Sequence, residues 1–224
     1  MRERAGVRDQ ISVTGMILKT EPVGEYDRRV VILTRERGKI AAFARGARKQ
    51  GSRLLASTNP FCFGEFTLYE GRSAYGITES SIRNYFEGFR EDFEGACYGM
   101  YFLEVMDYYT RENNDEKEML GLLYQSLRAL LHPGLSNELV RYIFEIRAIV
   151  INGEYPGLPV RKTPYLDSTV YALDYIAGSK LEKLYTFTVT DQVLGELGEI
   201  ALRYRKRFMD RKMKSLEILG EIPC

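Results

Sequence analysis

The hydrophobic period of this sequence changes once, near Phe86, and this change most constrains the fold. From Ile11 to Ser81, short runs of β-branched and aromatic residues are separated by Gly, Pro, Asn and charged residues. After Phe86, apolar residues recur about every 3.6 residues, which is the period of an amphipathic helix. The pattern therefore predicts an α+β protein of two domains, β-rich over residues 1–84 and helical over residues 85–224.

The β-rich part contains five candidate strands: VTGMILK, RRVVILT, KIAAFAR, FCFGEFTLY and SAYGITES. Five strands within about seventy residues suit a small closed barrel better than an open sheet, because closure leaves no exposed strand edge. The N-terminal domain is therefore predicted to be a five-stranded β-barrel.

The second domain is expected to contain helices over residues 91–110, from Asp115, over residues 136–153 and from Thr190. The first of these is expected to bury Phe93, Cys97, Met100 and Leu103. The last is expected to bury Val193, Leu197, Ile200, Tyr204 and Phe208. Residues 154–189 contain Pro156, Gly157 and Pro159 near their start and continue with the tyrosine-rich runs TVYALDYI and KLYTFTV. They are predicted to form an irregular segment with short strands or with segments that pack against a partner.

Charge is segregated along the chain, although the net charge is only +1. Residues 1–60 carry thirteen basic and six acidic residues, whereas residues 54–202 carry twelve and twenty-two. A phosphate polymer responds to the local field and not to the average charge of the molecule. The basic N-terminal third therefore indicates a phosphate-binding function.

The loop GARKQGS, residues 46–52, has the glycine spacing of a nucleotide-binding P-loop. A P-loop needs Lys and then Ser or Thr after its second glycine, to reach the phosphates and to bind magnesium. Here Gly51 is followed by Ser52 and Arg53, and Pro60 leaves little room for the helix that a P-loop requires. Nucleotide hydrolysis is therefore not expected.

The sequence also gives no support for a catalytic site built on histidine or cysteine, or for a metal site. The single histidine, His132, precedes a proline at a helix end, where a basic side chain favours the helix dipole. Cys62, Cys97 and Cys224 are far apart and have no metal-binding spacing, so no metal site is predicted. The sequence therefore predicts a protein that is not an enzyme.

Binding of a nucleic acid without sequence readout needs a positively charged groove for the phosphates and flat side chains on which bases stack. On the third strand, Lys39, Phe43 and Arg45 share one face, and the small apolar residues between them share the other. Phe43 either stacks on a base or lies in the core, and the pattern leaves both open. The predicted DNA-binding residues are Arg28, Lys39, Phe43, Arg45, Arg48, Lys49 and Arg53.

Several ordered motifs resemble the RecO family of bacterial DNA repair proteins. They are G-x-x-L-x-T, the acidic pair Glu25 and Asp27, L-T-x-x-x-G ending at Gly38, and A-R-G-A-R-K-x-x-S from Ala44 to Ser52, followed by YFLEVMDYYT and FEIRAIVINGEYPGL. The resemblance covers roughly residues 11–158. It implies an OB-fold barrel and a helical domain. It also implies a recombination mediator that binds single- and double-stranded DNA, anneals complementary strands and, with RecR, loads RecA onto DNA covered by single-stranded DNA-binding protein.

The sequence departs from the family pattern in one respect. Many members carry a four-cysteine zinc cluster after the G-x-x-P-x-L segment, but the sequence that follows Leu158 contains no cysteine before Cys224. The zinc of the family is therefore predicted to be absent. The segment is expected to be held by packing of Tyr165, Tyr171, Leu173, Tyr175 and Ile176 instead.

The resemblance also implies that the helical domain docks the acidic, apolar C-terminal tail of the single-stranded DNA-binding protein. Such a ligand needs an apolar groove with a basic rim. The final helix is the predicted docking site, through Arg203, Tyr204, Lys206 and Arg207. A second basic surface for DNA is the alternative for these residues.

The N-terminus, MRERAGVRDQ, lacks the apolar region of a secretory signal, and no apolar run reaches the roughly 18 to 20 residues of a membrane span. We therefore expect a cytoplasmic, nucleoid-associated protein without membrane contact. Two other functions stay open. A protein-interaction adaptor would not bind DNA, and an RNA-binding OB-fold protein would use the same stacking without distinguishing the sugar.

Overall fold

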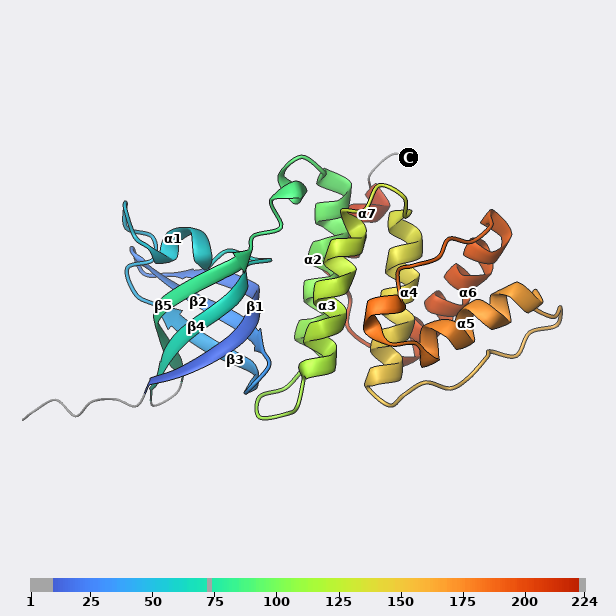
Figure 1. The fold of residues 1–224 in the computed structure, drawn as a ribbon, viewed down its shortest axis with the longest axis horizontal. Helices are drawn as coiled ribbons and strands as arrows, with labels where there is room; N and C mark the ends of the chain where they lie inside the picture. The colour runs from blue at the N-terminus through green and yellow to red at the C-terminus, as the bar shows by residue number, and fades with distance from the viewer. Residues whose placement is uncertain (1–9, 72–73, 222–224) are drawn as a thin grey trace, which may run out of the picture. The chain divides into compact units, whose positions relative to one another are not determined.

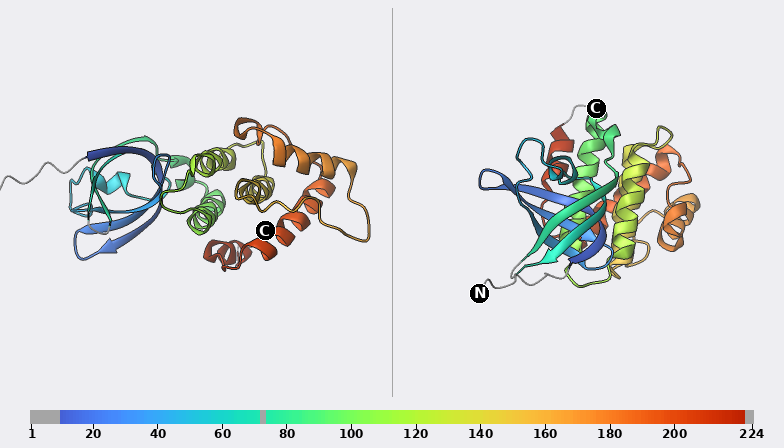
Figure 2. Two further views of the ribbon diagram at one scale, coloured as in Figure 1. Left: turned by 90° about the horizontal axis from the view of Figure 1, so that it is seen from below. Right: turned by 60° about the vertical axis from the view of Figure 1, so that its left-hand side comes forward.

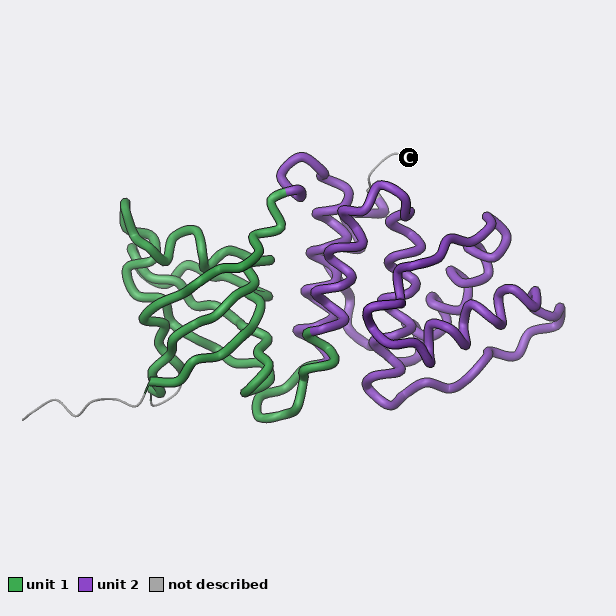
Figure 3. Tube along the Cα trace, viewed as in Figure 1, with its two compact units in different colours: residues 1–87, 110–120 green, residues 88–109, 121–224 purple. Residues whose placement is uncertain are grey.

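The computed structural model of the chain describes residues 10–71 and 74–221 (Figure 1). Residues 1–9, which carry the expectation about a secretory signal, and Cys224 lie outside the described residues. The chain divides into two compact units, shown in Figure 3. One comprises residues 1–87 and 110–120, and the other residues 88–109 and 121–224.

The first unit is a closed barrel of five strands (Figures 1 and 2), which confirms the predicted fold of this part. The strands follow the order β1-β2-β3-β5-β4 around the barrel. Strands β3 and β5 pair in parallel, and the other neighbouring pairs are antiparallel. The strand bounds are β1 Gln10–Val23, β2 Asp27–Thr34, β3 Gly38–Ala44, β4 Phe63–Glu70 and β5 Tyr75–Asn84, with the short helix α1 Leu54–Ser57 between β3 and β4.

Alternation along the strands sorts side chains between the barrel interior and its outer face. On β3, Ile40, Ala42 and Ala44 are buried in the core, and the residues between them are half-buried. The core also includes Ile17, Ile32, Phe66, Leu68 and Ile77. Strand β1 pairs with β4 through its first half and with β2 through its second half. A register shift between Ile17 and Lys19 lies within its second half, and such bulges bend a strand.

The connection between the first two long helices belongs to the barrel unit, which the sequence pattern did not predict. The Lys39 amide donates to the carbonyl of Arg111 at 3.0 Å, and the Asn113 amide donates to the carbonyl of Arg37 at 2.9 Å. Gly38 permits this approach, because a Cβ there would lie 2.3 Å from the Arg111 carbonyl oxygen. Its φ of +66° is also one that favours glycine.

Replacing Gly38 with alanine is therefore expected to lower the free energy of unfolding by about 2 kcal/mol, from backbone strain and a steric clash together. Gly24→Ala is the matched control. Gly24 has a similar φ of +56°, but a Cβ there would meet nothing within 4 Å. We expect the control to cost about 1 kcal/mol. Chemical denaturation of both variants measures the difference, and equal losses would show that the clash contributes nothing.

The second unit is built of helices and confirms the predicted helical domain. Its elements are η1 Glu87–Arg90, α2 Phe93–Tyr109, α3 Lys117–Leu130, α4 Asn137–Ile151, α5 Asp167–Gly178, η2 Leu181–Lys183, α6 Asp191–Phe208 and α7 Lys214–Glu221, of which Glu87 and the first turn of α3 belong to the barrel unit. The Ser136 hydroxyl accepts from the Leu139 amide at 3.3 Å and caps α4. Thr190 caps α6 in the same way, through the Val193 amide.

The predicted irregular segment 154–189 is wrong in its middle, because residues 167–178 form α5. Thr169, Ala172, Leu173 and Ile176 are buried at the spacing of one helix face. The β-branched and tyrosine residues of TVYALDYI favour a strand by propensity, and burial of this face overrides that preference. Helix α7 was not predicted at all.

The predicted buried face of α2 is also wrong in part. Phe93 is 69% exposed and Met100 is exposed, while Leu103 is buried as expected. The helix instead buries Tyr98, Tyr101, Phe102, Val105 and Met106. Phe102 stacks on Phe144 of α4 with ring centroids 4.0 Å apart. Apolar residues occur on both sides of this helix, so periodicity alone did not select the buried side.

A buried carboxylate joins three helices of this unit. Glu145 of α4 accepts hydrogen bonds at Oε1 from the Tyr101 hydroxyl of α2 at 2.7 Å, from Arg141 at 2.8 Å and from Arg205 of α6 at 3.2 Å. Its side chain is 1% exposed, and Oε2 makes no hydrogen bond with the described residues. Burial, together with the neighbouring Glu145, raises the pKa of Tyr101 well above its ordinary value, so this phenol stays a donor.

Candidate nucleic-acid interface

The outer face of β2 and β3 carries the first part of the predicted interface. Phe43 pairs with Arg29 across the two strands, and Lys39 pairs with Leu33. Phe43 is half-buried and is not part of the barrel core, which removes the core alternative for its ring. Lys39 is half-buried on the same face. An aromatic ring and basic side chains therefore share the outside of the barrel, as the sequence pattern predicted.

The loop after β3 presents the second part. Arg45, Arg48, Lys49 and Arg53 are all exposed. The side chains of Arg45 and Arg53 make no hydrogen bond or ion pair within residues 10–71 and 74–221. Their positive charges are thus not neutralised by a described carboxylate and are available to an anionic ligand.

The loop is held in place by the turn between β1 and β2. The Gly46 amide donates to the Asp27 carboxylate at 2.7 Å, and the Arg48 amide donates to the carbonyl of Tyr26 at 2.8 Å. The Arg48 side chain donates to the carbonyl of Gly24 at 3.2 Å. Ala47 is buried in the barrel core and so anchors the middle of the loop to the barrel. The loop is therefore a built element whose basic side chains project from a fixed backbone.

Arg28 has a different place from the other predicted residues. It is half-buried, and its Nη1 donates to the carbonyl of Leu55 at 2.8 Å, to Thr58 Oγ1 at 2.9 Å and to Asn59 Oδ1 at 3.1 Å. These contacts tie α1 and the residues after it to β2. Arg28 therefore holds the neighbouring segment, and its charge is shared with three protein acceptors.

Two tyrosines near this face were missed by sequence reasoning. Tyr26, in the β1–β2 turn, is 45% exposed, and the Lys49 ammonium lies 5.3 Å from its ring centroid. Tyr69 lies over Gly76, where a Cβ would be 2.1 Å from the ring, and Gly76 pairs with Phe43 on its other side. Tyr26 stands in a turn, where no strand alternation predicts its direction.

The predicted partner-binding residues on α6 divide into two groups. Tyr204 is 2% exposed, and its hydroxyl donates to the carbonyl of Gly157 at 2.6 Å, so its assignment to a docking surface is wrong. Arg203 pairs with Glu199 at 2.7 Å and donates to the carbonyl of Val160 at 3.0 Å. Lys206 and Arg207 are exposed, and the Arg207 guanidinium lies 5.1 Å from the Phe208 ring centroid.

The segment at the position of the family's zinc cluster is tied to α6 by Arg161. This guanidinium pairs with Glu196 and with Glu199, the latter at 3.1 Å, and stacks 3.8 Å from the ring centroid of Tyr165. Tyr165 is buried as expected, whereas Tyr171 is 73% exposed and does not hold the segment. Within residues 10–71 and 74–221, no group of three or more His, Cys, Asp or Glu side chains could hold a metal ion.

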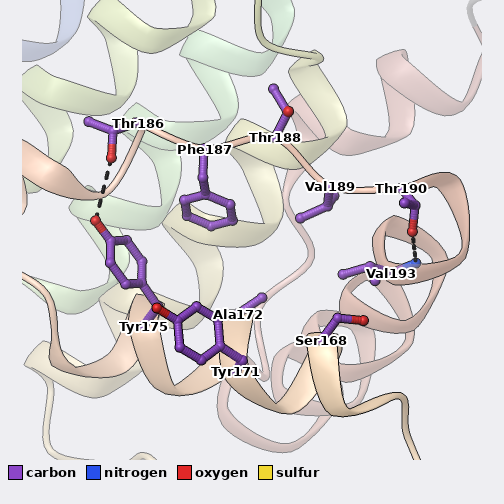
Figure 4. Close-up of a pocket in the computed structure, with 10 residues that line it drawn as sticks. All are labelled: Ser168, Tyr171, Ala172, Tyr175, Thr186, Phe187, Thr188, Val189, Thr190 and Val193. Atoms are coloured by element: carbon purple, nitrogen blue, oxygen red, sulfur yellow. Dashed lines mark hydrogen bonds between the residues drawn. The ribbon is translucent and has the colours of Figure 1, made fainter.

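A groove of about 470 Å³ runs between α5 and the residues that precede α6 (Figure 4). Tyr171, Tyr175, Phe187 and Val189 supply apolar surface to it, and four hydroxyl residues line it with them. The Tyr175 ring meets Phe187 edge to face at 5.3 Å, and its hydroxyl lies 3.4 Å from the Thr186 hydroxyl. The groove therefore presents a largely apolar surface within the helical unit.

Comparison with known proteins gives the family. Residues 8–86 match the family model "Recombination protein O N terminal", and residues 90–160 match "Recombination protein O C terminal". The chain belongs to the RecO family. The resemblance drawn from the motifs around Gly38 and Ser52 is thereby confirmed.

Two RecO relatives match over nearly their whole length. DNA repair protein RecO of Alkaliphilus metalliredigens is 33% identical over 244 residues, which cover 95% of this chain and 99% of the relative. DNA repair protein RecO of Acetivibrio thermocellus is 27% identical over 248 residues, which cover 96% and 99%. A role in DNA repair follows from membership in the RecO family. None of the helices in the described part of the chain has the length and apolar character needed to span a bilayer.

Proposed function

We propose that this chain is a non-enzymatic recombination mediator that binds single- and double-stranded DNA and anneals complementary strands. It would then assist the loading of RecA onto DNA covered by single-stranded DNA-binding protein, at the nucleoid. The observation that carries the proposal is the pre-built basic loop, in which Arg45, Arg48, Lys49 and Arg53 are exposed beside the half-buried Phe43. Membership in a family of DNA repair proteins supports the choice of DNA over other anions.

The chemistry of annealing needs charge and no bond breaking. Two complementary strands repel each other through their phosphates, and this repulsion extends over about 10 Å at 0.1 M salt. A basic face that neutralises phosphates of both strands lowers the barrier to pairing. Lys39, Arg45, Arg48, Lys49 and Arg53 are the proposed phosphate contacts. Phe43 is the proposed stacking residue, and Arg28 is proposed to position the neighbouring segment.

The proposed protein partners are RecR and the C-terminal tail of single-stranded DNA-binding protein. Because Tyr204 is buried and Arg203 pairs with Glu199, the proposed rim for the acidic tail reduces to Lys206 and Arg207, beside the half-buried Phe208 at the end of α6. A second DNA surface is the alternative for these two cations. The double variant Lys206→Glu/Arg207→Glu separates the two: loss of tail-peptide binding supports a docking rim, and loss of DNA affinity supports a second DNA surface.

We also propose that the chain folds without the zinc of many family members. The ion pairs of Arg161 with Glu196 and Glu199 support this, since they tie residues 157–166 to α6 without a metal. Elemental analysis of the purified protein is expected to find less than one tenth of an equivalent of zinc. One equivalent that resists dialysis against a chelator would overturn the proposal.

Strand annealing by the purified chain tests the function directly. Two complementary labelled oligonucleotides are expected to pair faster with the protein than without it, in the absence of any nucleoside triphosphate. A DNA strand is expected to compete for binding at least as well as an RNA strand of the same sequence. Preferred binding of RNA would favour the RNA-binding alternative, and binding of neither would favour a protein-interaction adaptor.

A further inference from the structure

The exposed ring of Tyr26 stands inside the basic loop cluster and has no evident structural task. Its side chain is 45% exposed and is absent from the barrel core. The contact that holds the loop here uses the Tyr26 carbonyl, which accepts from the Arg48 amide at 2.8 Å. Any residue at position 26 supplies that carbonyl. The aromatic side chain therefore needs another explanation.

The ring of Tyr26 lies beside a cation of the basic loop. The Lys49 ammonium lies 5.3 Å from the ring centroid, as a cation over an aromatic face. The neighbouring Glu25, as a hydrogen-bond acceptor, raises the pKa of the Tyr26 phenol, so the ring carries no negative charge at neutral pH. The bonds of Gly46 and Arg48 to the turn fix the distance between the ring and the loop that carries Lys49. Ring and ammonium thus form one preorganised pair.

We propose that Tyr26 and Lys49 together bind one unpaired nucleotide of a single strand, with the ring stacking on the base and the ammonium pairing with a phosphate. This inference rests on the proposed function and makes it more specific. In a duplex the bases are already stacked on their neighbours, so an exposed ring on the protein gains nothing from them. A single strand offers free base faces and phosphates together. Tyr26 is therefore assigned to single-strand preference, and Lys49 contributes to all nucleic-acid binding.

The test compares three ligands of equal length: an oligo-dT strand, the same backbone with abasic positions, and a DNA duplex. Tyr26→Ala is expected to weaken binding of oligo-dT about tenfold, because stacking of one base on an aromatic ring has roughly that worth. Its affinity for the abasic strand and for the duplex is expected to stay within twofold of the wild type. Tyr26→Phe keeps the ring and is expected to bind oligo-dT within about twofold of the wild type.

The salt dependence separates the two residues. Tyr26→Ala removes no charge, so the slope of log affinity against log salt is expected to be unchanged. Lys49→Gln is expected to make the slope for a single strand shallower by about 0.7, which is the effect of one lost phosphate contact. Tyr85→Ala is the matched control. Tyr85 is likewise an exposed tyrosine of the barrel unit, at 41%, but it lies outside the basic loop. It is expected to bind all three ligands as the wild type does.

The outcomes distinguish this inference from the proposed function. If wild-type protein binds no ligand at low salt, the proposed function fails and the inference fails with it. If the wild type binds with a salt-dependent affinity but Tyr26→Ala binds oligo-dT equally well, only the inference is wrong. If Tyr26→Ala loses affinity equally for all three ligands, the ring acts by holding the loop and not by stacking.

Discussion

Replacing Arg45, Arg48 and Lys49 together with glutamate is expected to weaken binding of single-stranded DNA by a hundredfold or more at physiological salt and to abolish annealing. The three side chains are exposed on a loop whose backbone is fixed by Asp27 and the β1–β2 turn. The substitution removes three phosphate contacts and places three negative charges where the polymer would lie. Each phosphate contact to a single strand releases about 0.7 of a counterion, and this release favours binding. Affinity therefore falls with each lost contact, and the new repulsion lowers it further.

The matched control carries the same change in net charge at another place. Lys162, Lys180 and Lys183 are exposed lysines of the helical unit, and reversing all three also changes the net charge from +1 to about −5. We expect this control to bind DNA within a few fold of the wild type at physiological salt, where separated charges are screened. Fluorescence anisotropy with a labelled strand measures both variants. Equal losses in the two would show that net charge and not the loop determines binding.

Removing the buried carboxylate of Glu145 is expected to have the largest effect on stability, a loss of about 3 kcal/mol for Glu145→Ala. This carboxylate is the common acceptor for Tyr101, Arg141 and Arg205 from three helices. Without it, two half-buried guanidinium groups and a buried phenol lose their partner, and such unpaired groups are costly. Glu145→Gln keeps the size but not the charge, and its loss is expected to lie between the alanine variant and the wild type.

An exposed ion pair supplies the comparison for Glu145. Glu21 pairs with Lys19 and Arg29 on the barrel surface, and its side chain is 41% exposed. Glu21→Ala is expected to change the free energy of unfolding by less than about 1 kcal/mol, because exposed pairs contribute little. Denaturant unfolding followed by circular dichroism measures both. If Glu145→Ala were as mild as Glu21→Ala, the buried cluster would not be a stabilising junction of the three helices.

The sequence was sufficient for those features that depend on short-range pattern. The strand alternation around Ile40 and Ala42 gave the inside of the barrel, and the caps Ser136 and Thr190 gave the starts of two helices. The stripe from Val193 to Ile200 gave the buried face of α6. Each of these features depends on residues within about one or two helical turns or one strand.

The features that could not be predicted depend on contacts distant in sequence. The stripe of α6 already placed Tyr204 on the buried face, but the acceptor of its hydroxyl, the carbonyl of Gly157, lies forty-seven residues away and could not be predicted. From the sequence alone, Arg28 is expected to be a surface cation, because its acceptors near Asn59 are about thirty residues away in the chain. The exposed side of α2, at Phe93, depends on which neighbouring helices cover the other side. Tyr26 was missed because a turn gives no periodic signal.

The salt dependence of DNA binding tests the central claim most directly. Affinity of the wild-type chain for a labelled single strand is measured by anisotropy from 50 to 200 mM salt. About five phosphate contacts from the β3 face and its loop predict a slope near −3.5 in log affinity against log salt, hence roughly a hundredfold weakening over this range. Absence of binding at 50 mM salt, or an affinity that does not change with salt, would contradict a basic barrel face that grips the DNA backbone.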